Sequence, residues 1–158
     1  MELKTKIHAE DGKQELLITR EFELPLELLF KAYIEPEIVE QWMGTKVLKL
    51  ENKNHGSYQF ETTDQMGNKH GFSGVIHELV MNRKITRTFE MENANFGPQL
   101  EFLEFEKLTD DSGDHQSKLS MHIVYRSVTL RDQILQLPFA QGINMAHNRL
   151  QKIMNTIK

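Results

Sequence analysis

Hydrophobic and polar side chains alternate along residues 14–24. Successive side chains of a β-strand point to opposite faces of the sheet, so a period of two predicts a strand with one buried face. The face predicted to be buried carries Leu16, Ile18, Arg20 and Phe22. The first element of the fold is therefore expected to be a strand.

The pattern changes to a helical period directly after this strand. Pro25 suits the first position of a helix, where its missing N–H costs nothing. The apolar positions that follow recur every three or four residues, which is typical of one helix face. They are Leu26, Leu29, Phe30 and Tyr33.

A second short helix is predicted over residues 36–43. Pro36 disfavours the helical conformation in the residue before it, so it ends the first helix and can begin the next. Ile38, Val39 and Trp42 share one face of this second helix, and Gly44 follows as a stop signal. Trp42 is the only tryptophan in the chain. It is interpreted either as a core anchor or, with Met43, as the cap of a cavity mouth.

The middle of the chain alternates between strand-like segments and turn-forming clusters. The clusters are rich in Gly, Asn, Asp and Pro, which favour turns. Because short turns join neighbouring strands, an antiparallel meander is expected. The predicted strands cover residues 46–51, 57–63, 70–80, 85–92, 100–108 and 118–126.

The C-terminal part returns to a helical period. Thr129 and Asp132 resemble a helix cap, and Pro138 is expected to begin or kink a helical run. The last run carries a continuous apolar stripe, which can cover the apolar face of a one-layer sheet. The stripe consists of Ile143, Ala146, Leu150, Ile153 and Ile157. The prediction is an α+β fold in a single domain over residues 1–158, with 1–13 as a flexible or edge segment.

Composition removes several classes of function. The net charge of −4 and the scattered basic residues argue against binding to a nucleic-acid backbone. The chain has no cysteine, which excludes thiol catalysis and Cys-based zinc sites. No apolar stretch approaches the roughly 20 residues that a membrane span needs. The expected location is the cytoplasm.

Chemical motifs are absent as well. The seven histidines include no His-x-x-x-His spacing, so no metal site is predicted. No glycine-rich nucleotide loop or Gly-x-Ser-x-Gly motif occurs, so no cofactor and no catalytic residue are predicted. Whether the protein is an enzyme stays open, with a non-enzymatic role favoured.

An ordered set of segments carries a resemblance to a known family. The segments are "ITREFELPLELLFKAYIEPEIVEQWMG" (18–44), "HGSYQFE" (55–61), "GFSGVIHELVMNRKITRTFE" (71–90) and "RDQILQLPFAQGINMAHNRLQKIM" (131–154). In this order they resemble the START-like (SRPBCC) superfamily, and within it the proteins related to the C-terminal domain of the activator of Hsp90 ATPase. The resemblance implies a helix-grip fold. Such a fold has a curved antiparallel sheet of about six or seven strands around a long C-terminal helix, with two short helices after the first strand.

The resemblance also implies a ligand cavity between sheet and C-terminal helix. Candidate polar contacts are His77, Glu78 and Arg87. The candidate lining is Trp42, Met43, Tyr58, Phe60, Phe72, Phe89, Met121, Ile123, Phe139, Ile143 and Met145. The chain departs from the family pattern at Met43 and Ile143, where relatives often carry aromatic residues, and at His55, where they often carry glycine.

Three functions are compatible with these observations. The leading expectation is binding of a small hydrophobic or amphipathic molecule, such as a lipid or a polyketide-like or other aromatic compound. The alternative is a protein-interaction module or a regulator related to the Hsp90 chaperone. The third is a cyclase- or hydratase-like enzyme. The ligand and the oligomeric state stay open.

Overall fold

One antiparallel sheet forms the frame of the molecule. The computed structural model describes residues 3–110 and 113–157. In that part of the chain the strands are ordered β1-β2-β8-β7-β6-β5-β4-β3. They are β1 (Lys6–His8), β2 (Glu15–Phe22), β3 (Lys46–Leu50), β4 (Gly56–Thr63), β5 (Lys69–Val80), β6 (Lys84–Met91), β7 (Gln99–Asp110) and β8 (Gly113–Val124). The predicted meander is therefore confirmed, and β2 closes against its last strand.

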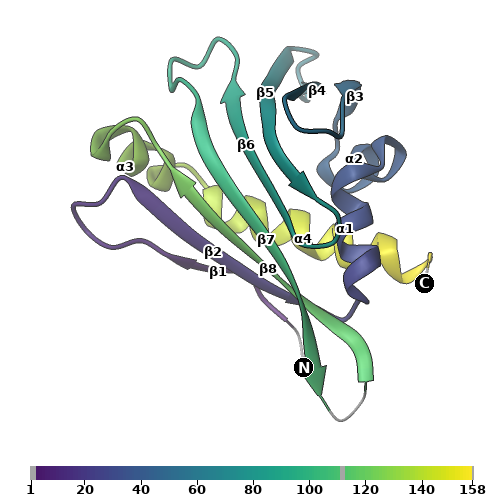
Figure 1. Ribbon diagram of the computed structural model, residues 1–158. Helices are drawn as coiled ribbons and strands as arrows, with labels where there is room; N and C mark the ends of the chain where they lie inside the picture. Colours follow the sequence, from purple (N-terminus) through teal and green to yellow (C-terminus); the bar gives the residue numbers. More distant parts are fainter. Residues whose placement is uncertain (1–2, 111–112, 158) are drawn as a thin grey trace.

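The helices cover one face of this sheet. They are α1 (Leu26–Ile34), α2 (Pro36–Met43), α3 (Val128–Gln136) and α4 (Phe139–Asn155). In Figure 1, α4 runs behind the strands, α1 and α2 lie towards one side of the sheet, and α3 lies towards the other. This is the predicted α+β helix-grip arrangement.

Strand β2 shows why the sheet has an inner and an outer face. Its inward side chains are covered by the helices, whereas Glu15, Leu17 and Glu21 on the other face remain exposed. The buried set is Leu16, Ile18, Arg20 and Phe22, as the alternation predicts. The sequence pattern thus defines which face of the sheet can build a core or a cavity.

Helices α1 and α2 are joined tightly to each other. The indole N–H of Trp42 donates a hydrogen bond of 2.7 Å to the carbonyl of Ala32, and the rings of Trp42 and Tyr33 lie 5.0 Å apart between centroids. Gly44 ends α2 in the left-handed conformation, with φ of 64°. The predicted buried face and stop signal are both confirmed.

Two boundaries differ from the sequence prediction. Residues 6–8 pair with β2 as strand β1, and the strand count rises to eight among the described residues. The cap of α3 is Ser127 rather than Thr129, and its hydroxyl accepts from the N–H of Leu130 at 3.1 Å. Asp132 contacts Nη2 of Arg131 instead, at 2.8 Å.

The buried face of α4 is rotated slightly from the predicted stripe. Leu150 is fully buried as expected, but the other buried residues of the helix are His147 and Met154. Ile157 lies beyond the helix end and is exposed. The predicted stripe counted only Ile, Leu and Ala. It therefore did not include His147 and Met154, which are buried on the same helix.

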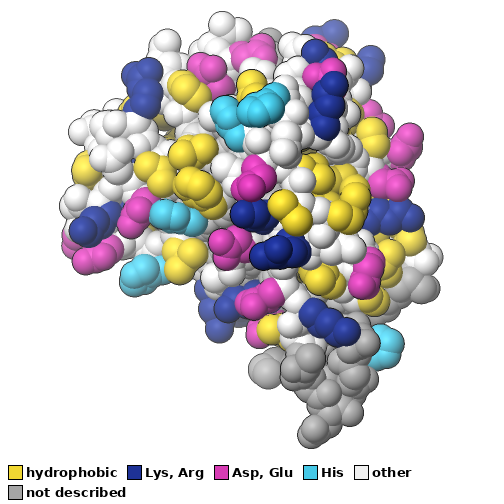
Figure 2. Space-filling model, viewed as in Figure 1, with side chains coloured by type: hydrophobic (Ala, Val, Ile, Leu, Met, Phe, Trp, Pro, Cys, Tyr) yellow, Lys and Arg dark blue, Asp and Glu magenta, His cyan; other side chains and the backbone are white. Residues whose placement is uncertain are grey.

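The surface carries charges of both signs. On the face shown in Figure 2, basic and acidic side chains are interspersed, and apolar and histidine side chains lie between them. No helix in the described part of the chain combines the length and apolar character that a membrane crossing requires.

Candidate ligand-binding cavity

A cavity of about 410 Å³ lies between the inner face of the sheet and α4, and it opens to the surface. Apolar side chains dominate its lining. They are Trp42, Met43, Phe72, Phe89, Met121, Ile123, Phe139, Ile143 and Ala146, with Gly142 beside them. The polar lining residues are Tyr33, Arg87, Gln99, Glu101 and His147.

Strand alternation brings the sheet side of this lining together. Arg87 and Phe89 are two residues apart on β6, and Met121 and Ile123 are two apart on β8, so each pair points to the same face. The ring of Phe72, on β5, stacks on that of Phe89 with 5.5 Å between centroids. The sheet side of the cavity is therefore mainly apolar, with Arg87 as a charged member.

Helix α4 supplies the opposite wall. Phe139, Ile143 and Ala146 are spaced by three or four residues, and therefore lie on one side of the helix. Met145 lies on another side and is 50% exposed. The expectation that Met145 lines the cavity is wrong, because its position turns it away from the sheet.

Trp42 is a core residue that also contributes to the cavity lining. It is only 4% exposed, and its hydrogen bond to α1 fixes it as a core anchor. One side of it nevertheless lines the cavity, next to the half-buried Met43. Arg149 of α4 donates to the carbonyl of Trp42 at 3.0 Å, which ties α2 to the cavity-bearing helix.

Tyr58 and Phe60 belong to the core rather than to the cavity lining. Both are buried on β4, and the hydroxyl of Tyr58 donates to the carbonyl of Thr88. The guanidinium of Arg87 lies over the ring of Tyr58, 5.3 Å from its centroid. Arg87, rather than Tyr58, therefore lines the cavity at this point.

The pair His77 and Glu78 does not reach the cavity either. The register of β5 against β6 shifts between Ile76 and Glu78, and His77 at this irregularity is exposed. Glu78 forms an ion pair of 3.1 Å with Lys84. Strict alternation places one of the two inward, but the bulge breaks that alternation.

A buried ion pair forms the polar part of the lining. Arg87 and Glu101 face each other across β6 and β7, and Nε of Arg87 donates to Oε1 of Glu101 at 2.9 Å. The side-chain amide of Gln99 donates to Oε2 at 2.7 Å. Both oxygens of the carboxylate therefore already accept hydrogen bonds within the protein.

Tyr33 brings a hydroxyl into the same region. Burial raises the pKa of Tyr33 above its ordinary value, and the charges of Arg87 and Glu101 also act on it. The phenol therefore keeps its proton at neutral pH and can donate a hydrogen bond.

His147 lines the cavity from α4 as a neutral ring. Burial first, and then the charge of Arg20, lower the pKa of His147 from 6.5 to about 3. Its Nδ1 lies 2.7 Å from the hydroxyl of Thr5, and that hydroxyl accepts from Nη1 of Arg20 at 3.4 Å. Because Thr5 accepts from Arg20, it can donate to Nδ1, which leaves the imidazole proton on Nε2.

Sequence reasoning missed six lining residues, which are Tyr33, Gln99, Glu101, Gly142, Ala146 and His147. The sequence does contain one indication for Glu101, because it lies two and four residues before the buried Leu103 and Phe105 and therefore on the same face of the strand. The strand also carries apolar residues at the other parity, so its inward face could not be chosen from the pattern.

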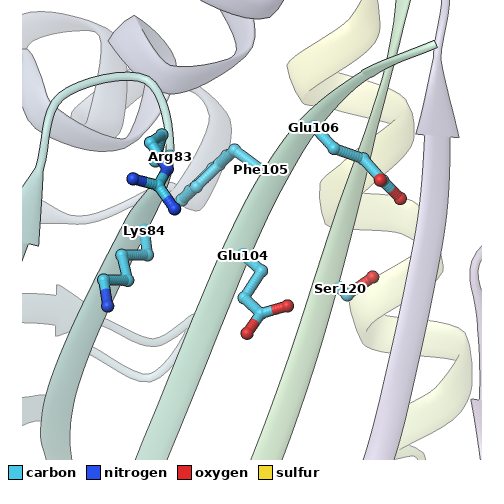
Figure 3. Close-up of a pocket in the computed structure, with 6 residues that line it drawn as sticks. All are labelled: Arg83, Lys84, Glu104, Phe105, Glu106 and Ser120. Atoms are coloured by element: carbon cyan, nitrogen blue, oxygen red, sulfur yellow. The ribbon is translucent and has the colours of Figure 1, made fainter.

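Other hollows lie on the outer face of the sheet. Figure 3 shows one of about 280 Å³ in which the side chains of Lys84 and Glu104 extend from neighbouring strands, near Ser120. Its lining is mainly charged and exposed. No group of three or more potential metal ligands occurs among residues 3–110 and 113–157. The cavity beneath α4 is the candidate site because it combines a mainly apolar lining with buried polar groups.

Solved structures share the fold across almost the whole chain. A protein from Rhodobacter sphaeroides aligns with a TM-score of 0.82 at 18% identity, covering 98% of this chain and 100% of its own. One from Mycobacterium smegmatis gives 0.81 at 17% identity, with 96% of each chain covered. One from Arthrobacter aurescens gives 0.84 at 11% identity, covering 96% of this chain and 91% of its own. At these identities the likeness concerns the fold.

Sequence comparison gives the family. No curated protein matches the chain. The family model described as "Activator of Hsp90 ATPase homolog 1-like protein" matches residues 23–155, which span α1 to the end of α4. The chain therefore belongs to the family of Activator of Hsp90 ATPase homolog 1-like proteins, in agreement with the resemblance of its sequence.

Proposed function

We propose that this protein binds a small hydrophobic or amphipathic molecule in the cavity between the sheet and α4. The observation that carries the proposal is the cavity itself, which has a volume of about 410 Å³ and a mainly apolar lining. Ligand pockets typically measure about 300 to 1,000 Å³ and combine apolar walls with a few polar groups. The cytoplasmic location remains a prediction.

Binding would rest on burial rather than on covalent chemistry. Each Å² of apolar ligand surface that leaves water contributes roughly 25 cal/mol. The rings of Phe72 and Phe89 offer aromatic surface to an aromatic or isoprenoid-like ligand. Met43 and Met121 have flexible side chains that adapt to irregular apolar shapes.

The test is a titration with a library of lipids and aromatic compounds. Trp42 lines the cavity and is the only tryptophan, so its fluorescence reports occupancy. A ligand that binds only the folded state also raises the midpoint of thermal unfolding, by an amount that corresponds to about 2.7 kcal/mol at one hundred times Kd. If no member of a broad library changes either signal, the proposal fails.

A matched pair of substitutions locates the binding site. Ala146 lines the cavity, whereas Ala140 lies on the exposed side of the same helix. Ala146→Phe should fill the cavity and weaken binding at least tenfold, and Ala140→Phe should leave affinity unchanged. Equal affinities for the two variants would place the ligand elsewhere.

The family description motivates a second candidate function, regulation of an Hsp90-type ATPase. Such a regulator should bind the chaperone and stimulate its ATP turnover. If both assays are negative under conditions in which an established activator works, this candidate is excluded. Binding in the cavity does not depend on that outcome.

The enzyme hypothesis needs at least two polar groups that converge in the cavity. Arg87 and Glu101 do converge there, but both oxygens of Glu101 already accept hydrogen bonds. This arrangement favours orientation of a ligand over proton transfer. Arg87 is the one polar residue from the sequence prediction that lines the cavity, so turnover would have to respond to its substitution.

A further inference from the structure

We propose that Arg87 and Glu101 make the cavity selective for amphiphiles whose polar end is a neutral hydrogen-bond acceptor, such as a ketone, ester or amide carbonyl, over amphiphiles that end in a carboxylate. This inference rests on the proposed function, because it concerns the ligand of the same cavity. It follows from the hydrogen bonds, the charge balance and the apolar surroundings of the pair.

The first step concerns unused donors. A guanidinium carries five N–H groups, and Arg87 uses its Nε on Glu101. Within residues 3–110 and 113–157 no hydrogen bond is found for Nη1 or Nη2 of Arg87, although the side chain is only 10% exposed and lines the cavity. Donors that are largely removed from water favour a ligand that brings an acceptor.

Tyr33 adds a donor of the same kind. Its ring lines the cavity, it is 6% exposed, and its hydroxyl has no hydrogen-bond partner in the described part of the chain. Arg87 and Glu101 are the two charged residues that act on this hydroxyl. Arg87 and Tyr33 therefore both belong to the cavity lining, where each offers a donor to an acceptor on the ligand.

The second step concerns charge. Among the residues that the structure describes, Arg87 and Glu101 are the only charged ones in the lining, and their charges cancel at 2.9 Å. His147, the other titratable ring of the lining, is neutral. A ligand carboxylate would add an uncompensated negative charge beside Glu101, in a site where water screens it poorly. A neutral carbonyl uses the same donors without that penalty.

The third step concerns the rest of the ligand. Phe89, two residues from Arg87 on β6, and Ile123 on β8 continue the inner face as apolar surface. Phe139 and Ile143 face them from α4. A ligand that places its carbonyl at Arg87 can therefore lay an apolar body between the sheet and the helix, which defines an amphiphile with one polar end.

The experiment compares three ligands of equal chain length: decane, 2-decanone and decanoate. Affinities for the wild-type protein at pH 7 are measured through Trp42 fluorescence and by calorimetry. The ketone should bind at least tenfold more tightly than both the hydrocarbon and the carboxylate. The ratio of ketone to carboxylate in the wild-type protein is decisive by itself, so it does not depend on whether any variant folds.

Two substitutions then separate the donors from the charge. Glu101→Gln keeps an acceptor for Arg87 but removes the neutralising charge, so decanoate should bind at least tenfold more tightly than it binds the wild type, and the affinity ratio of ketone to decanoate should fall. Arg87→Met should abolish the preference of the ketone over decane. Circular dichroism establishes that each variant is folded.

The outcomes distinguish this inference from the proposed function. Equal affinity for all three ligands, or tighter binding of decanoate by the wild type, would overturn the selectivity while leaving ligand binding intact. Unchanged decanoate affinity in folded Glu101→Gln would overturn the role of the charge. If none of the three ligands binds, two claims are overturned: the selectivity, and the binding of simple amphiphiles in this cavity.

Discussion

At the scale of single residues, Trp42 connects the core to the candidate site. Its indole N–H bonds to Ala32, its ring packs on Tyr33, and one side of it lines the cavity. A residue with several buried partners cannot move as a free gate without losing them. Trp42 is therefore a fixed wall, and the half-buried Met43 is the adaptable neighbour.

This role predicts a stability cost for Trp42→Phe. The variant loses a buried hydrogen bond and leaves part of the indole volume empty, which together should lower the free energy of unfolding by about 1–3 kcal/mol. Urea unfolding followed by far-ultraviolet circular dichroism measures this without tryptophan. Met43→Leu, which conserves volume, should cost less than about 1.5 kcal/mol. Equal midpoints for wild type and Trp42→Phe would contradict the anchor role.

His147 predicts a pH dependence of stability. Its pKa is about 3 in the folded chain and 6.5 for the unperturbed group, so between these values the unfolded state binds a proton that the folded state does not. Stability from this group is fully present above pH 6.5 and falls as the pH drops through the window. The slope is about 1.4 kcal/mol per pH unit.

The matching variant is His147→Gln, which cannot titrate. Urea unfolding of both proteins from pH 7 to pH 4 should show a shallower loss of stability in the variant, by about 1 kcal/mol per pH unit. Carboxylates contribute to the slope of both proteins and cancel in the comparison. Parallel slopes would mean that His147 is protonated in the folded protein.

At the scale of elements, the sequence predicts best where one face is clearly apolar. Strand β2 and helices α1 and α2 were correct in type and in buried face. Strand β7 was predicted at the correct position, but its inward face could not be chosen, because Phe102 and Phe105 lie on opposite faces of the strand. Of these two residues, only Phe105 is buried. Glu101 shares the parity of Phe105, so its place in the cavity emerged only from the pairing with β6.

The cavity residues show a second limit. His147 was missed because a polar residue on an apolar stripe is usually read as a solvent-facing position, whereas contacts with Thr5 stabilise it inside. His77 and Glu78 were candidates because alternation places one of them inward, and a bulge moved both away. Irregularities of the backbone and contacts between distant segments are not encoded in local periodicity.

Replacing glycine by alanine should have opposite effects on stability at Gly142 and at Gly44. Gly142 lies within α4, and a Cβ there would meet no atom within 4 Å. Gly142→Ala should therefore stabilise the protein by about 0.5–1 kcal/mol, because alanine favours the helix. Gly44 ends α2 with φ of 64°, so Gly44→Ala should destabilise it by about 1–2 kcal/mol. Thermal midpoints that move in the same direction would contradict this.

At the scale of the whole molecule, the sheet and α4 remain partly separated. Helices α1 and α2 fill one region with aromatic residues such as Phe30 and Tyr33, which pack on Phe105. Beyond them the space is left open, with an ion pair of Arg87 and Glu101 in its wall. The architecture of the family is shared, but the cavity takes its chemistry from side chains at a few inward positions.

Nuclear magnetic resonance of the methionine methyl groups tests ligand binding in this cavity most directly. Met43 and Met121 line the cavity, whereas Met66 and Met81 are 86% and 60% exposed and lie outside it. When 2-decanone is added to protein with labelled methionine methyl groups, the signals of Met43 and Met121 should shift and saturate together, and those of Met66 and Met81 should stay in place. Shifts confined to Met66 and Met81, or no saturable shift at Met43 and Met121, would contradict a ligand between the sheet and α4.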